Sequence, residues 1–189
     1  MTRAEIRTRM IALSIGTRGN GTPEADNIRA AVLVPLVERA QGWFVLLTLR
    51  AADLAAHAGQ ISFPGGHIEP EDPDAIHAAL REAEEEIGLP MHNVEVVGRL
   101  DTWLTGTGFE ITPVVGLVRP PDSFVPDPDE VAEVFEVPLD FVLDRRNHQR
   151  RSRELRGAQR SFFVLPYQHR NIWGATAGML VNLAEVLTR

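Results

Sequence analysis

A helix that carries glutamates along one side constrains this chain more than any other stretch of its sequence. Apolar residues recur there at the spacing of a helical stripe, at Ala75, Ile76, Ala79, Leu80, Ala83 and Ile87. Asp72 and Asp74 stand where an N-cap or first-turn acid belongs, and Gly88 stands where a left-handed C-cap belongs. We therefore predict a helix that begins next to the two aspartates and ends at Gly88.

Three glutamates of this helix are expected to share one face. Glu82, Glu85 and Glu86 are spaced i, i+3 and i+4, which brings their side chains within about 5–6 Å of one another. Their mutual repulsion is relieved if a cation lies among them, and an all-oxygen ligand set suits Mg²⁺ or Mn²⁺. The alternative is a solvated acidic face, the usual environment of a charge run.

Roles for these carboxylates follow from the metal hypothesis. We assign Glu82 and Glu86 as principal metal ligands, and Glu85 as either a further ligand or the general base. Glu69 and Asp72, in the acidic loop before the helix, are candidates for additional ligands. Arg81, counted with the catalytic residues, is expected to orient a glutamate or the glycine turn through an ion pair.

Composition excludes several classes of function. A net charge of −7 argues against a general nucleic-acid binder, which usually shows a basic excess. No apolar run approaches the roughly 18 residues of a membrane span. The N-terminus lacks the pattern of a signal peptide, and 4–15 is expected to be a helix. Cysteine is absent, which excludes thiol chemistry and agrees with a cytoplasmic location.

The rest of the chain alternates strand-like and helical patterns. Apolar runs predict strands at 28–36, 43–49, 94–100, 109–118, 130–137 and 161–167, and a terminal helix at 172–187. The first two strands are expected to form a hairpin, and Pro113 suggests an edge strand or a bulge. This order fits one α/β domain over residues 1–189, built as an α/β/α sandwich with a mixed sheet.

Two further segments suggest contact with phosphate. Gly65 and Gly66 follow Pro64, and adjacent glycines permit the close backbone approach that a turn beside a phosphate needs. The charge-dense segment 140–156 carries arginines that are either solvated or form an anion-steering patch: Arg145, Arg146, Arg150, Arg151, Arg153 and Arg156. One glutamate of the 130–137 strand is a candidate base or outer metal ligand.

The segment from Gly66 to Leu89 resembles the Nudix box, G-x5-E-x7-R-E-U-x-E-E-x-G-U, where U is aliphatic. REAEEEIGL at 81–89 matches its second half, whereas Asp72 replaces the first glutamate and one extra residue precedes Arg81. Upstream, LLTLRA at 46–51, Gly59 and FPGG at 63–66 resemble the signature of the coenzyme A pyrophosphatase branch, with Ala55 in place of its second arginine.

This resemblance implies the Nudix fold and hydrolysis of coenzyme A and its derivatives to 3′,5′-ADP and 4′-phosphopantetheine, with Mg²⁺ or Mn²⁺. It also implies a substrate-binding set of Arg50, Gly59, Phe63, Gly65 and Gly66. Two alternatives stay open: a Nudix pyrophosphatase for ADP-ribose, NADH or a dinucleoside polyphosphate, and a non-catalytic nucleotide sensor. The expected partner is a small nucleotide, without nucleic acid or membrane; a homodimer is left open.

Overall fold

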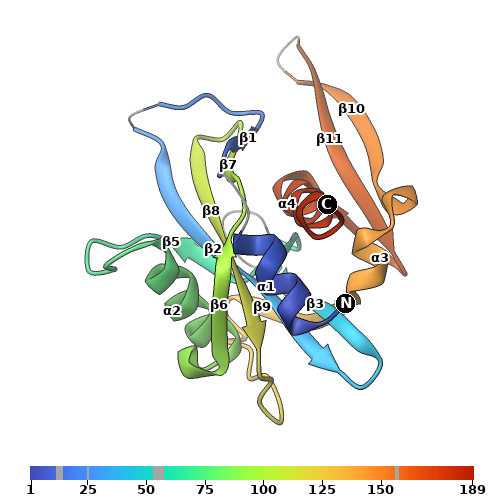
Figure 1. The fold of residues 1–189 in the computed structure, drawn as a ribbon. Helices are drawn as coiled ribbons and strands as arrows, with labels where there is room; N and C mark the ends of the chain where they lie inside the picture. The colour runs from blue at the N-terminus through green and yellow to red at the C-terminus, as the bar shows by residue number, and fades with distance from the viewer. Residues whose placement is uncertain (12–14, 25, 53–57, 156–157) are drawn as a thin grey trace.

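The structure, a computed structural model, describes residues 1–11, 15–24, 26–52, 58–155 and 158–189. The described chain forms two β-sheets with helices packed around the larger one (Figure 1). Its helices are α1 (Arg3–Ile11), α2 (Ala75–Ile87), α3 (Leu139–Leu143) and α4 (Gly174–Leu187), with 3₁₀ turns at Met91–Asn93 and Arg145–Asn147. No helix in these ranges is long and apolar enough to cross a bilayer.

The larger sheet is mixed, as predicted. Its main strand order is β1-β7-β8-β2-β3-β4, while β5 pairs with β2, β6 with β8 and β9 with β3. These strands are β1 (Thr17–Gly19), β2 (Ile28–Arg39), β3 (Gly42–Arg50), β4 (Ile61–Ser62), β5 (Gly65–His67), β6 (Val94–Arg99), β7 (Thr102–Leu104), β8 (Phe109–Val118) and β9 (Val131–Pro138). β2 and β3 form the predicted hairpin, and β2 runs parallel to β8 on its other side.

The strand β2 divides the sheet into two branches. Its first half pairs with β5, where Ala31 lies opposite Gly66, and its last residues pair with β3. Between the two branches the backbone N–H of Leu33 donates to the carbonyl of Pro64, 2.9 Å away. The glycine turn at 63–66 is therefore held in the fork of the sheet by backbone hydrogen bonds.

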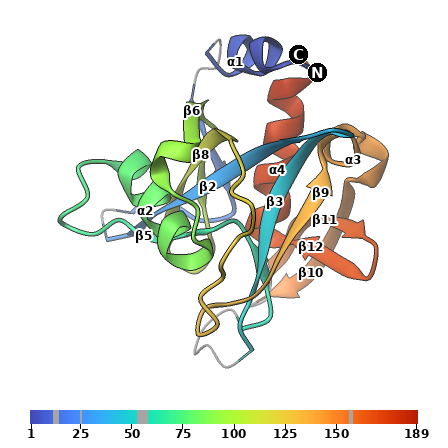
Figure 2. The same cartoon turned by 90° about the horizontal axis from the view of Figure 1, so that it is seen from below.

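Alternation along β2 creates the two layers that cover the sheet. Ala31 and Leu33 are buried in the cluster that includes the α2 alanines, whereas Val34 and Leu36 are buried with α1 and α4. Successive side chains of a strand point to opposite faces, so the strand contributes to both cores. Figure 2 shows α2 on one side of the sheet and α4 on the other. The expected α/β/α arrangement is confirmed.

A smaller antiparallel sheet, absent from the sequence expectations, packs beside α4. It consists of β10 (Gln149–Leu155), β11 (Ala158–Tyr167) and β12 (Arg170–Trp173). The basic segment that reads as solvated surface therefore supplies the edge strand of a hairpin. β12 also corrects the predicted start of the last helix at Ile172, because α4 begins only at Gly174, which has a left-handed φ of 67°.

Two other expectations are corrected. Within the described residues the N-terminal helix covers Arg3–Ile11, and Ile15, at the predicted end of the helix, is not helical; residues 12–14 lie outside the described ranges. Pro113 is not on an edge strand, since β8 pairs with β2 on one side and with β6 and β7 on the other. The carbonyl of Pro113 accepts a hydrogen bond from the N–H of Leu100 at the junction of β6 and β7. The ladder on this side of β8 is already interrupted at that junction, which is where the N–H that proline lacks would have pointed.

Candidate active site

Helix α2 is fixed at both ends by the caps that its sequence predicts. The Asp74 side chain accepts a hydrogen bond from the N–H of His77 at 2.8 Å. Gly88 adopts the left-handed conformation, with φ of 63°, and its N–H bonds back to the helix carbonyls. The alanines at 75, 78, 79 and 83 are buried against the sheet. Glu82 follows Ala78 by four positions and Glu86 follows Ala79 by seven, so both glutamates lie along this same face of the helix. There they approach the glycine turn at Gly65 and Gly66.

The three glutamates of the predicted metal face diverge in burial. The side chain of Glu86 is 3% exposed, that of Glu82 15% and that of Glu85 60%. Within the described ranges, no three acidic or histidine side chains form a compact metal-ligating group. Glu82 and Glu86 line the same cavity, whereas Glu85 points to solvent beside Arg81. Helix α2 thus contributes two carboxylates to the cavity lining and a third at the rim of the cavity.

Glu86 is a buried acid, and the charge of its ionised carboxylate is only partly compensated by its neighbours. One of its oxygens accepts from the N–H of Gly65 at 3.1 Å, and the other lies 3.7 Å from Nη1 of Arg50, beyond hydrogen-bond distance. Burial, reinforced by Glu82 and Glu130, raises the pKa of Glu86 to about 8. Burial also raises the pKa of Glu82. Nε of Arg50 is buried with no hydrogen-bond partner within the described residues.

The two glycines of the turn are required by close approach. A Cβ on Gly65 would lie 2.4 Å from the carbonyl oxygen of Ala31 and 2.6 Å from Cα of Val32. A Cβ on Gly66 would lie 2.6–2.7 Å from the carboxylate of Glu82. The first glycine thus lets β5 pair against β2, and the second leaves space for the carboxylate of Glu82.

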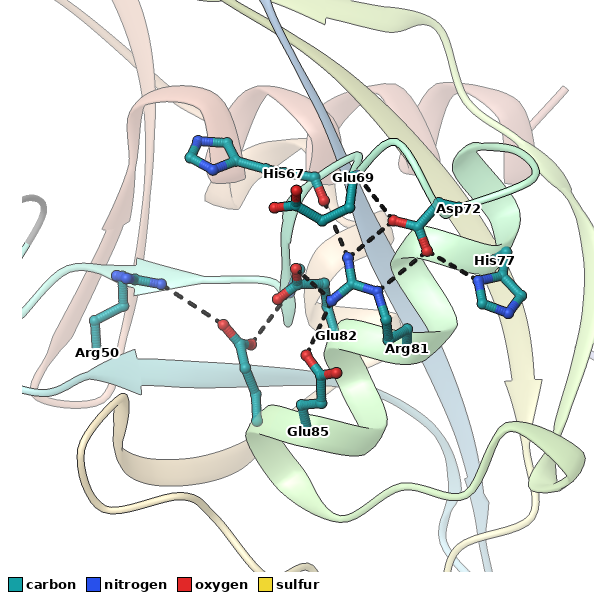
Figure 3. Close-up of polar contacts among 10 residues, drawn as sticks. Arg50, His67, Glu69, Asp72, His77, Arg81, Glu82 and Glu85 are labelled. Atoms are coloured by element: carbon teal, nitrogen blue, oxygen red, sulfur yellow. Dashed lines mark hydrogen bonds and ion pairs between the residues drawn. The ribbon is translucent and has the colours of Figure 1, made fainter.

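Arg81 organises the acidic groups around it (Figure 3). Its Nε and Nη2 donate to the two oxygens of Asp72 at 3.1 and 2.9 Å. Its Nη1 donates to Glu82 and to Glu85, each at 2.9 Å, and its Nη2 also reaches the carbonyl of His67 at 3.2 Å. Arg81 therefore forms ion pairs with both the acidic loop and the helix.

The structure gives Asp72 a partner that the sequence did not specify. Its side chain is 2% exposed and accepts from Arg81, from Nδ1 of His77 and from the N–H of Glu69. The Arg81 guanidinium holds the pKa of Asp72 well below its usual range. Asp72 does not line the cavity, whereas Glu69 does. A structural anchor therefore describes Asp72 better than a metal ligand.

The remaining predicted residues lie near the same turn. Phe63 is 2% exposed and contributes to the larger core, and its segment lines the cavity together with Arg50. Gly59 has φ of 66°, and its N–H bonds to the carbonyl of Arg50 at 3.2 Å, which closes the loop that follows β3. Ala55, which replaces the arginine of the branch signature, lies outside the described residues.

One cavity, with a volume of about 1030 Å³, connects these groups. Its lining includes four carboxylates: Glu69, Glu82, Glu86 and Glu130. Among the glutamates of the 130–137 strand, Glu133 pairs with Arg170 and Glu136 with Arg39, which leaves Glu130 facing the cavity. The cavity also takes in Arg18, which pairs with Asp101 and Glu185; no local sequence signal indicates its position.

The carboxylates of the cavity fit a divalent cation. Glu86 is a buried acid whose ionised form is not fully compensated by Arg50 and Gly65, and partial burial raises the pKa of Glu82 despite its ion pair with Arg81. A hard cation would favour their ionised state, and oxygen ligands are those that Mg²⁺ and Mn²⁺ prefer. Glu69 and Glu130 on the same lining are available as further or water-mediated ligands.

Comparisons with known proteins agree with this geometry. Residues 27–156 match the NUDIX domain family. The chain is 44% identical over 156 residues to an uncharacterized Nudix hydrolase NudL of Citrobacter koseri, covering 82% of this chain and 81% of the relative. It is 41% identical over 160 residues to the protein of that name in Photorhabdus laumondii, covering 85% of each. A solved structure from Deinococcus radiodurans, 13% identical, has a TM-score of 0.52 and covers 84% of this chain and 86% of its own, a likeness of fold alone.

Proposed function

Since the chain belongs to the NUDIX domain family and is a Nudix hydrolase, an enzyme acting on phosphoric anhydrides, we propose that its substrates are coenzyme A and its derivatives. Hydrolysis of their diphosphate would give 3′,5′-ADP and 4′-phosphopantetheine or its acyl form. The proposal rests on the signature LLTLRA, Gly59 and FPGG at 46–66. One observation supports it above the others: Arg50 and the two glycines of this signature line the same cavity as Glu82 and Glu86.

The metal-binding part of the proposal concerns Glu82 and Glu86. Both would hold Mg²⁺ or Mn²⁺, with Glu69 as an additional ligand. When bound, the cation neutralises charge on the diphosphate oxygens and lowers the pKa of water. Gly65 donates its N–H to Glu86, and Arg81 donates Nη1 to Glu82, so each carboxylate is oriented by a neighbour before substrate enters.

The protein's own groups then have separate tasks. Arg50 is 24% exposed, and its buried Nε has no hydrogen-bond partner among the described residues, so its guanidinium is placed to bind a phosphate oxygen. A glutamate that faces the cavity accepts the proton of the attacking water while the bridging P–O bond breaks and the leaving phosphate keeps its electron pair. Of the two candidates for this base, Glu130 lines the cavity and Glu85 is engaged by Arg81 at the rim, which favours Glu130.

A comparison of substrates tests the proposal directly. Purified protein is incubated with coenzyme A, ADP-ribose or NADH separately, in Mg²⁺ or Mn²⁺, and the products are separated by chromatography. We expect preferential formation of 3′,5′-ADP from coenzyme A. Preferential cleavage of ADP-ribose or NADH would agree with a hydrolase but contradict the assignment of coenzyme A as substrate.

Substitution of the proposed ligands tests the metal assignment. We expect Glu82→Gln and Glu86→Gln each to lower kcat by at least about a hundredfold, because an amide removes the charge that holds the cation. The same variants should weaken Mn²⁺ binding measured by electron paramagnetic resonance. Glu84→Gln, an exposed position on the same helix, is the matched control. Near-normal turnover in both ligand variants would contradict the assignment.

A further inference from the structure

The cavity that contains the carboxylates extends to a second, cationic wall. Arg150 and Arg153 line it from β10, at the edge of the smaller sheet. In Figure 1 the β10–β11 hairpin stands across α4 from β1, β7 and β8, whereas β5 and α2 lie at the left of the larger sheet. A substrate with charged groups at two places can therefore contact both walls.

The two arginines differ from their neighbours in their partners. Arg146 pairs with Asp144, and Arg151 donates to Gln149, both within the same segment. Within the described part of the chain, neither Arg150 nor Arg153 has a carboxylate at ion-pair distance. In a protein of net charge −7, these side chains create a local positive field at the cavity.

The hairpin is held in a defined place relative to the larger sheet. β11 pairs with β12, which leads directly into α4. Across the cavity, Nη1 of Arg160 donates to the carbonyl of Asn20 at 3.0 Å, which ties β11 to the segment after β1. The ring of Phe162 also packs edge-on against Trp173, with centroids 6.1 Å apart. The arginines on β10 are thus presented by a braced strand.

We propose that Arg150 and Arg153 bind a second phosphate of the substrate, a phosphomonoester separate from the diphosphate that is cleaved. This inference rests on the proposed function, in which the diphosphate lies at the carboxylate wall. A phosphomonoester carries a charge of about −1.5 to −2 at neutral pH, and the planar guanidinium fork matches its oxygens. The two arginines are therefore specificity-determining residues that select nucleotides with such a group on the ribose.

Paired substrates that differ only by this group test the inference. The ratio of kcat/KM for coenzyme A to that for 3′-dephospho-coenzyme A is measured for the native chain and for the double variant Arg150→Ala/Arg153→Ala. We expect the double variant to lose about tenfold to a hundredfold in kcat/KM for coenzyme A and less than about threefold for the dephosphorylated form. The ratio should consequently approach one.

A matched control separates the subsite from net charge. The double variant Arg145→Ala/Arg151→Ala removes two charges from the same segment without touching the cavity lining, and it should leave the ratio unchanged. Arg150→Lys/Arg153→Lys keeps the charge but loses the fork, and it should retain part of the discrimination. Equal losses on both substrates, or the same change in the control, would overturn the inference.

A second substrate pair distinguishes failure of this inference from failure of the proposed function. If coenzyme A is not cleaved, the proposed function fails, and NADPH and NADH become the test pair because only NADPH carries an extra phosphomonoester. A preference for NADPH that disappears in Arg150→Ala/Arg153→Ala supports the subsite. A native enzyme that does not discriminate within either pair overturns it.

Discussion

The substitution Asp72→Asn tests the structural role of the Asp72 carboxylate, which binds Arg81 of helix α2. It removes one charge and alters one oxygen, so volume and packing hardly change. Asp72 is 2% exposed at its side chain and accepts two hydrogen bonds from Arg81, one from His77 and one from the backbone of Glu69. The amide can keep the backbone bond but cannot form the paired, charge-assisted contact with the guanidinium.

The expected loss of stability follows from this contact. Breaking a buried ion pair by removing one partner typically costs about 3–5 kcal/mol. Arg81 remains 22% exposed and keeps Glu82 and Glu85 as partners, which places the expected loss near the lower end, at about 3 kcal/mol. For a chain of 189 residues this corresponds to a fall in Tm of about 6–12 °C.

Urea denaturation followed by circular dichroism measures this loss, with Asp74→Asn as the matched control. Asparagine is as good an N-cap as aspartate, so the control should change the free energy of unfolding by less than about 0.5 kcal/mol. The depressed pKa of Asp72 stabilises the fold above its ordinary value of 3.8, and this contribution disappears as pH falls. The difference between native chain and variant should therefore shrink on acidification. Equal stability of the two variants at pH 7 would refute the reasoning.

Three further predictions concern the glutamates of the proposed site. In metal-free protein the free energy of unfolding should fall by about 3–4 kcal/mol between pH 5 and pH 8, because Glu86, with a pKa of about 8 against an ordinary 4.5, keeps a proton in the folded state that the unfolded chain releases. Urea titrations in chelator should show a flatter profile for Glu86→Gln. Gly66→Ala should reduce kcat at least tenfold with little change in Tm, because the added Cβ displaces the flexible end of the Glu82 side chain. The control Gly106→Ala should retain activity, because the atom nearest to its added Cβ lies 3.5 Å away. Glu130→Gln should lower kcat by about a hundredfold, whereas the same loss in Glu85→Gln alone would assign the base to the rim glutamate.

Local signals account for the parts of the fold that the sequence predicts well. The apolar stripe of α2, its N-cap at Asp74 and its left-handed C-cap at Gly88 all act within a few residues, and the structure confirms each. The β2–β3 hairpin is likewise set by two apolar runs and the short turn between them. The Nudix box identifies which helix this is, because the spacing of the residues in the box depends on that same helical geometry.

Long-range packing determines what the sequence could not indicate. Helical spacing placed Glu82, Glu85 and Glu86 on one face, but only the path of the glycine turn decides which of them is buried. Asp72 meets Arg81 because of how the acidic loop folds back over the helix. Its substitution for the first glutamate of the box therefore left its role open until the loop was seen in three dimensions.

A basic segment and a proline are two further places where local sequence preference predicts the wrong structure. The basic segment 140–156 contains a strand because β11 supplies its partner, and no apolar alternation marks β10 in the sequence. Pro113 normally indicates a strand edge, yet here the sheet changes partner on one side of β8 at that residue. In both places pairing between distant segments overrides the local preference.

The parallel pairing of β2 with β8 also determines when the site can exist during synthesis. Ile28 lies opposite Phe109 and Val37 opposite Val118, so the paired residues are roughly eighty positions apart. Helix α2 and the glycine turn are both translated within that interval, and β2, on which the turn is docked, lacks its long neighbour until β8 has left the ribosome. We expect a nascent chain stopped before Phe109 to carry every glutamate of the acidic helix and yet be inactive, so that activity is acquired only late in translation.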